Sequence, residues 1–192
     1  AAMFAETLHS LADTVNQIFL LVGLRLGRRP PNEEHPFGYG RERYFWAFIV
    51  SLSIFLVGAV YSFLEGLHKI QHPEPVSSPH VNFIVLGLAM AFEGVAFYLA
   101  IKEFNKRRGT TPVFKAVRQS KDPGLFTVLF EDAAAMAGLV IAFVGLLVAE
   151  YLGVIWADGA ASIGIGLLLA TVAIFLCFET KGLFIGEAVS DE

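Results

Sequence analysis

The sequence contains a single cysteine, Cys177, so the chain cannot form an internal disulfide. Charged residues are also scarce: they make up 17% of the 192 residues, whereas 55% are hydrophobic and the mean hydropathy is +0.61. Soluble domains carry about 25% charged residues, so this composition excludes an ordinary soluble domain. The sequence has no glycine-rich phosphate-binding loop, which argues against a nucleotide-driven activity.

Long apolar runs dominate the sequence instead. The chain has 18 Phe and 18 Gly residues, which suit lipid-facing helices with small residues at their contacts. Crossing a bilayer takes roughly 20 apolar residues in a helix. We therefore expect an all-α membrane protein, a polytopic transmembrane helix bundle that occupies residues 1–192 as one domain. Its spans are predicted at 3–25, 44–68, 81–103, 123–150 and 157–180.

The basic residues predict how these spans are oriented. Of the 14 Lys and Arg residues, all but Lys69 lie after the first span, in or beside the connection after the third, or after the last. Basic residues collect in cytoplasmic loops, so these connections are expected to be cytoplasmic. The visible N-terminus is then outside and the C-terminus cytoplasmic.

The first predicted span carries a pair of candidate metal ligands. His9 and Asp13 are four residues apart, so their side chains lie on one face of a helix. Three further polar residues lie near this face: Glu6, Asn16 and Gln17. Together the five residues occupy an arc of about 100° around the helix axis. The rest of the helix is apolar, with Leu8, Leu11, Val15, Ile18 and Phe19. Ionisable groups at membrane depth usually line an ion path, although a structural contact between helices is the alternative.

The fourth span carries two adjacent carboxylates, Glu131 and Asp132. Neighbouring residues of a helix are about 100° apart, so both cannot face the same way. One is expected to reach the site while the other faces a neighbouring helix or a water path. Carboxylates that lie close together repel unless a proton or a cation lies between them. The structural alternative is a buried carboxylate paired with a polar neighbour.

Other polar residues are weaker candidates. Glu93 in the third span fits either a proton-coupling role or a structural hydrogen bond. The segment between Asn32 and His35 fits either a weak second metal site or a solvated turn. His68 and His72 have metal-compatible spacing, but they lie at the edge of a Pro-rich loop, where such residues are common.

These motifs together resemble the cation diffusion facilitator family, the proton-coupled exporters of zinc and related divalent metals. The segment His9-Ser-Leu-Ala-Asp13 matches the metal pair of that family's second helix. The segment His35-Pro-Phe-Gly-Tyr-Gly-Arg41 resembles its following loop, and Phe130-Glu131-Asp132 resembles its fifth helix. The combination is most similar to the branch that includes the mitochondrial human zinc transporter.

The resemblance implies that the five spans are helices two to six of a six-helix domain, without the family's first helix and its cytoplasmic C-terminal domain. It also implies a homodimer and a metal site of His9, Asp13 and Asp132. The family's remaining ligand position is Val128 here, which cannot bind metal, so Glu131, Asn16 or a water is expected to supply the fourth ligand. In the loop site His35 matches, whereas Asn32 and Tyr39 replace stronger ligands, so we expect that site to be weak or lost.

The expected function is secondary transport rather than an enzymatic reaction. Divalent cations, with Zn²⁺ favoured, would leave the cytoplasm in exchange for protons, because metal and protons compete for the same His and carboxylate atoms. No cofactor is expected beyond the transported cation, and the partners are the cation, protons and the bilayer, without nucleic acid. The alternatives are a non-transporting membrane scaffold or partner subunit and an intramembrane metalloenzyme.

Overall fold

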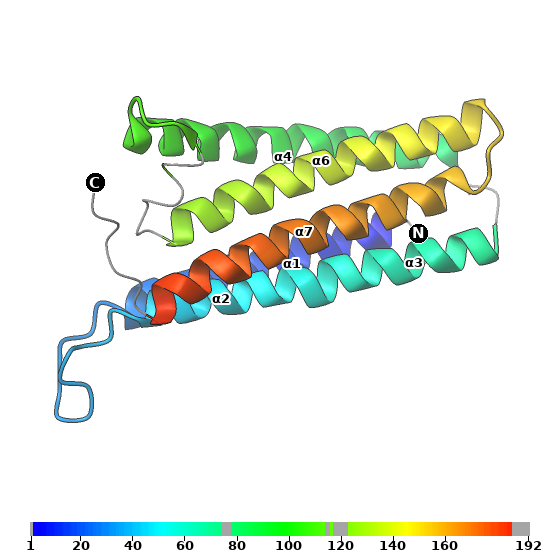
Figure 1. Ribbon diagram of the computed structural model, residues 1–192. Coiled ribbons are helices and arrows are strands. Elements are labelled where there is room, and N and C mark those ends of the chain that lie inside the picture. The colour runs from blue at the N-terminus through cyan, green and yellow to red at the C-terminus, as the bar shows by residue number, and fades with distance from the viewer. Residues whose placement is uncertain (1, 74–77, 114–115, 117–122, 186–192) are drawn as a thin grey trace.

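The computed structural model describes residues 2–73, 78–113, 116 and 123–185, and the side chains of 2–10, 12, 13, 55, 123, 183 and 184 lie outside that description. Within the described residues all regular structure is helical, which confirms the expected all-α bundle (Figure 1). The helices are α1 (Ala2–Leu26), α2 (Glu42–Ser53), α3 (Tyr61–Gln71), α4 (Pro79–Arg108), α6 (Pro123–Tyr151) and α7 (Ala157–Ile185).

The second predicted span is a single rod made of three parts. A π-helical segment, η1 (Ile54–Val60), joins α2 to α3 without a break in the helix. A π-helical turn contains more residues than an α-helical turn, so it changes which residues face the neighbouring helices. The apolar pattern of the sequence predicts the rod but not this local widening.

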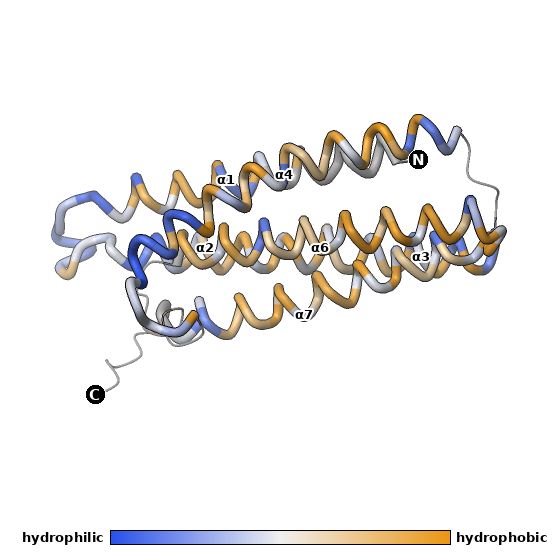
Figure 2. The backbone as a smooth tube through the Cα atoms, turned by 90° about the horizontal axis from the view of Figure 1, so that it is seen from above, coloured by the Kyte–Doolittle hydropathy of each residue, from blue (hydrophilic) through white to orange (hydrophobic). Residues whose placement is uncertain are grey.

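The helices have the length and polarity of membrane spans. Four are long and apolar enough to cross a bilayer: Glu42–Gln71, Pro79–Arg108, Gly124–Tyr151 and Ala157–Gly182. Within the described residues, α1 contributes the shorter apolar stretch Thr14–Leu26. Figure 2 shows hydrophilic residues gathered toward the ends of the bundle and hydrophobic residues along its length.

Successive helices run in opposite directions, so every second connection lies at the same end of the bundle. In Figure 1, α1, α4 and α7 finish and α6 starts at the end that carries loop 27–41. This end, which we call the basic-loop end, holds Arg25, Arg108 and Lys181 near the helix termini. The predicted clustering of basic residues at one end is therefore present in the fold. Lys69 lies at the opposite end, where its Nζ is 2.9 Å from Asp158 Oδ2.

The helices α3 and α7 approach each other through glycine. A Cβ added to Gly66 would lie 2.6 Å from the carbonyl oxygen of Gly159, and one added to Gly166 would lie 2.8 Å from the backbone nitrogen of Phe63. These separations are shorter than any side chain allows, so the two backbones touch along this line. Small residues at helix contacts are a common feature of membrane bundles.

The helix α1 packs along α2 by a different arrangement. The Phe19 and Trp46 ring centroids are 5.3 Å apart, and a Cβ on Gly23 would lie 2.8 Å from Trp46 Cβ. Trp46 Nε1 donates a hydrogen bond to Glu42 Oε2 at 3.0 Å. These contacts fix the basic-loop half of α1, and thereby the direction of its polar face.

The α3–α7 contact gives a first prediction. Gly66→Ala should lower the free energy of unfolding by about 1–3 kcal/mol, because the two atoms nearest to the new methyl group belong to the backbone of α7 and cannot move aside as a flexible side chain can. Thermal unfolding in detergent or lipid nanodiscs measures the effect. The matched control is Gly87→Ala in α4, where a Cβ has no neighbour within 4 Å among the described residues. It should be neutral or mildly stabilising, and equal losses in the two variants would contradict the proposed contact.

Candidate metal site between α1 and α6

A buried hydrogen bond joins α1 to α6. Asn16 Nδ2 donates to Glu131 Oε1 at 2.6 Å, across 115 residues of sequence. Asn16 is only 3% exposed and Glu131 only 7%. A carboxyl group removed from water needs hydrogen-bond partners, so this contact stabilises the approach of the two helices.

This hydrogen bond distinguishes the two adjacent acids of α6. Glu131 faces α1, where it accepts the hydrogen bond from Asn16. Asp132 is half-buried and lies about 100° further around the helix. The expectation that one acid faces a neighbouring helix is therefore confirmed for Glu131. Whether Asp132 binds metal stays a prediction.

The other two predicted ligands lie on α1, on the same side as Asn16. The backbone of His9 and Asp13 belongs to α1, but their side chains lie outside the described residues. Asp13 precedes Asn16 by three residues, so helix geometry puts it one turn further from the basic-loop end. Among the described side chains, no three His, Cys, Asp or Glu residues come close enough to hold a metal ion. That finding does not include His9 and Asp13, so the metal site remains a prediction.

Part of the apolar side of α1 faces outward as its sequence predicts, whereas Phe19 is half-buried against Trp46 of α2. Leu11, Val15 and Ile18 are all exposed, at 59%, 37% and 50%, as expected for side chains that face lipid. Gln17 is exposed as well, whereas Asn16 is buried. The predicted polar stripe is therefore not uniform, because its described members lie in different surroundings.

The position that matches a metal ligand in the resembled family is filled by apolar packing. Val128 is partly buried and packs against the cluster of buried hydrophobic residues that includes Phe126 and Leu176. Phe130, two residues on, has its ring centroid 4.9 Å from that of Phe175 on α7. The Val128 position is thus occupied by hydrophobic contacts, in agreement with its lack of a donor atom.

One polar residue of α6 escaped the sequence analysis. Thr127 is fully buried, and it lies one helical turn before Glu131. Its signal in the sequence was the four-residue spacing to Glu131, which places both on one face. A threonine in an apolar helix is common enough that this spacing alone predicts little. Burial is what makes the residue informative.

The weaker candidate Glu93 lies in the middle of α4. It is half-buried, and its neighbours Phe92 and Val95 are exposed, at 77% and 61%. A Cβ on Gly94 would lie 3.3 Å from the Met136 side chain, so this stretch of α4 packs against α6. Glu93 is therefore close to the helix that carries Glu131 and Asp132, but its proton-coupling role stays a prediction.

The loop candidates form a small network around Tyr39. Asn32 Nδ2 donates to the Tyr39 hydroxyl at 3.0 Å, and Asn32 Oδ1 accepts from the His35 backbone N–H at 2.7 Å. The His35 and Tyr39 rings stack with centroids 4.3 Å apart, and the Arg29 guanidinium carbon is 6.0 Å from the Tyr39 ring centroid. The residues at the predicted weak loop site thus bind one another, and these contacts close the turn.

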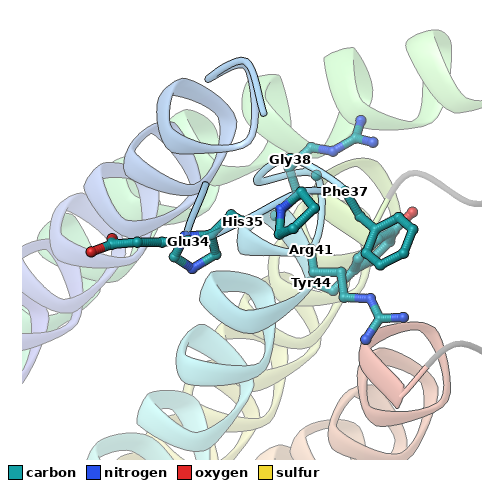
Figure 3. Close-up of a pocket in the computed structure, with 9 residues that line it drawn as sticks. Glu34, His35, Phe37, Gly38, Arg41 and Tyr44 are labelled. Carbon is teal, nitrogen blue, oxygen red and sulfur yellow. The ribbon is translucent and has the colours of Figure 1, made fainter. Parts of the chain in front are cut away.

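A hollow lies beside this network, and His35 belongs to both. Its volume is about 560 Å³, and Figure 3 shows His35, Phe37, Arg41 and Tyr44 around it. Phe37 is completely exposed at the tip of the turn. The residues that line the hollow do not include Asn16 or Glu131, so it is separate from their contact.

The remaining histidine pair is at the opposite end of the bundle. The ring of His68, on the last turn of α3, stacks with that of His72, the residue after the helix, with centroids 5.0 Å apart, and both residues are exposed. Two exposed imidazoles one turn apart are a weak basis for a metal site, as the sequence analysis expected.

Known sequences point to one family. Residues 1–183 match the cation efflux transmembrane domain. The chain is 36% identical over 194 aligned residues to the mitochondrial proton-coupled zinc antiporter SLC30A9 of Xenopus laevis, covering 100% of this chain and 35% of that protein. It is 34% identical to metal tolerance protein C4 of Arabidopsis thaliana, covering 99% of this chain and 42% of the relative. The manganese efflux system protein MneS of Bacillus subtilis is 23% identical, over 90% of this chain and 54% of the relative. The chain thus spans about a third of the length of the zinc antiporter and less than half of the length of the metal tolerance protein.

The α1–α6 contact gives a second prediction. Asn16→Ala should lower the free energy of unfolding by about 1–3 kcal/mol, because it removes the amide that donates to a buried carboxyl group. Thermal unfolding in nanodiscs measures the loss. Gln17→Ala is the matched control, since Gln17 is the next residue of the same helix but is exposed, and it should stay within about 0.5 kcal/mol of the parent protein. Equal effects of the two substitutions would show that the contact contributes no stability.

Proposed function

Because the chain belongs to the cation efflux family, we propose that this integral membrane protein is a secondary transporter, which exports divalent metal cations, with Zn²⁺ as the preferred cargo, in exchange for protons. The observation that supports the proposal most strongly is the buried Asn16–Glu131 hydrogen bond. It joins the two helices that carry the candidate ligands, and it lies within about two turns of His9 and within one turn of Asp13 and Asp132 along these helices.

In the proposed site, the cation binds the imidazole of His9 and the carboxylates of Asp13 and Asp132. A neutral nitrogen ligand with two carboxylates suits Zn²⁺, and the two negative charges offset the charge of the ion. Val128 offers no donor atom, so Glu131, Asn16 or a water completes the coordination. The same donor atoms take up protons when the metal leaves. The site therefore holds either the metal ion or protons, but not both.

Alternating exposure of this site to the two sides of the membrane gives metal/proton antiport without a nucleotide or a covalent step. We propose that the basic-loop end is cytoplasmic, because Lys and Arg collect in cytoplasmic loops. The cation then enters from that end and leaves at the opposite one. Glu93, on the helix that packs against this part of α6, is proposed to assist the proton step. We also propose that two copies form a homodimer.

The relatives argue against the alternatives. Their names describe zinc antiporters, a metal tolerance protein and a manganese efflux protein, and none describes an enzyme. A non-transporting scaffold would also need no polar contact such as Asn16–Glu131 within its apolar helices. Transport is therefore the function that the residues and the relatives support best.

The proposal predicts that His9→Ala, Asp13→Ala and Asp132→Ala each abolish Zn²⁺ uptake into proteoliposomes, because each removes a ligand of the cation. Uptake is followed with a zinc-sensitive dye inside the vesicles. Gln17→Ala is the control on the same helix, and it should transport at the parent rate because its side chain is exposed. Unchanged uptake in all three alanine variants would exclude the proposed site.

The same vesicles test proton exchange. With a pH-sensitive dye inside, Zn²⁺ entering the lumen should drive protons out, so the luminal pH should rise only when external Zn²⁺ is present. Glu93→Gln should slow this pH change more than it weakens Zn²⁺ binding. Zinc uptake without any luminal pH change, in vesicles whose membrane potential is clamped, would show uniport instead of antiport.

A further inference from the structure

The hydroxyl of Thr127 is buried without a partner. The residue is 0% exposed, and its Oγ1 has no hydrogen-bond partner among the residues that the structure describes. Other helical hydroxyls donate to the carbonyl oxygen four residues earlier: those of Ser51, Ser53, Ser162, Thr171 and Thr180. Leaving a buried hydroxyl unsatisfied costs about 1–3 kcal/mol, a cost that valine of the same shape would not carry. Thr127 is thus an unfavourable residue for packing alone.

The position of Thr127 relates it to the α1–α6 contact. Thr127 precedes Glu131 by four residues, so it lies on the same face of α6, about 6 Å closer to the basic-loop end. Glu131 is itself bonded to Asn16. A hydroxyl, a carboxyl group and a side-chain amide therefore share one buried column, and all three residues are at least nine-tenths buried.

This column lies closer to the basic-loop end than the proposed Zn²⁺ ligands do. Asn16 is three residues closer to the basic-loop end than Asp13, and Glu131 one residue closer than Asp132. A cation that enters from the basic-loop end thus passes Thr127 first, then Asn16 and Glu131, and then the His9, Asp13 and Asp132 ligands.

The donor atoms of the column are all oxygens. Thr127 offers Oγ1 and Glu131 offers carboxylate oxygens, and Asn16 retains Oδ1 as an acceptor while its Nδ2 donates. Oxygen donors without nitrogen or sulfur suit hard divalent cations such as Mn²⁺ and Mg²⁺ better than they suit Zn²⁺. On the neighbouring face of α6, the position that corresponds to Thr127 is Val128, which has no donor atom.

We propose that Thr127, Glu131 and Asn16 form a second cation position, made of oxygen ligands, on the basic-loop side of the His9, Asp13 and Asp132 site. Its role as an entry position rests on the proposed transport function, whereas its existence as a binding site does not. Thr127 is the residue that makes it a site, because its hydroxyl otherwise has no partner in the described part of the chain. The arriving cation takes the place of the hydrogen bond from Asn16 to Glu131.

Binding of Mn²⁺ to the protein in nanodiscs tests the site without any transport. The loss of the electron paramagnetic resonance signal of free Mn²⁺ gives the bound fraction. A His9→Ala/Asp13→Ala background removes the proposed Zn²⁺ ligands of α1, and it should still bind Mn²⁺. Adding Thr127→Val to this background should raise the Kd about tenfold, while Thr127→Ser, which keeps the hydroxyl, should bind as the background does. A background that binds no Mn²⁺, or an unchanged Kd on adding Thr127→Val, would overturn the proposal.

Thr180→Val is the matched control for folding. Thr180 is also 0% exposed and lies in a helix, but its Oγ1 donates to the Leu176 carbonyl oxygen at 2.6 Å. In the same background this variant should keep the Mn²⁺ Kd and lower the Tm, because it removes a made hydrogen bond. Thr127→Val should do the opposite and keep or raise the Tm. Equal changes in Kd for the two variants would assign the effect to packing and overturn the proposal.

A transport measurement separates this inference from the proposed function. With His9 and Asp13 intact, Thr127→Val should raise the KM for Mn²⁺ several-fold more than the KM for Zn²⁺. If the unsubstituted protein moves neither cation, the proposed function fails, and the Mn²⁺ binding measurement alone decides the second site. If transport is normal and Thr127→Val changes neither KM nor Kd, the second site fails and the proposed function stands.

Discussion

The buried hydrogen bond between Asn16 and Glu131 is the contact on which the account of this protein depends. It joins α1 and α6 deep within apolar helices, where a carboxyl group without a partner would be costly. The partner is an amide, which satisfies a carboxyl oxygen but adds no charge. A basic partner such as arginine would neutralise the carboxylate and leave no attraction for a cation. The amide of Asn16 does not itself neutralise a negative charge on Glu131, which suits the proposed metal/proton exchange.

The two helix contacts of the bundle differ in kind. The α3–α7 contact is made by backbone against backbone at Gly66, Gly159 and Gly166, so any sliding there brings backbone atoms into collision. The α1–α6 contact includes a hydrogen bond between long side chains, which can be exchanged for bonds to a cation without moving either backbone far. In the proposed mechanism, changes of cation occupancy therefore act first at α1–α6, while α3 and α7 stay together.

Much of the fold follows from the sequence, because apolar runs of the right length and a one-sided distribution of basic residues have few other solutions in a bilayer. The contacts that position the candidate site cannot be predicted from the sequence. Glu131 and Asp132 are adjacent, and only the packing of α6 decides that Glu131 faces Asn16. The π-helical segment η1 and the Tyr39 network depend on contacts between distant or irregular segments, which periodicity does not encode. Thr127 was overlooked because a threonine in an apolar helix usually bonds to its own backbone, and its burial without such a bond is visible only in the structure.

The central claim is that α1 and α6 bind a divalent cation between them through His9, Asp13 and Asp132. Anomalous scattering at the zinc edge from the Zn²⁺-saturated protein tests it most directly. The account predicts a peak between the two helices, within about 2.0–2.2 Å of a His9 nitrogen and of oxygens from Asp13 and Asp132. A strongest peak at His35 in the loop or at His68 and His72 on α3, with no peak between α1 and α6, would contradict it.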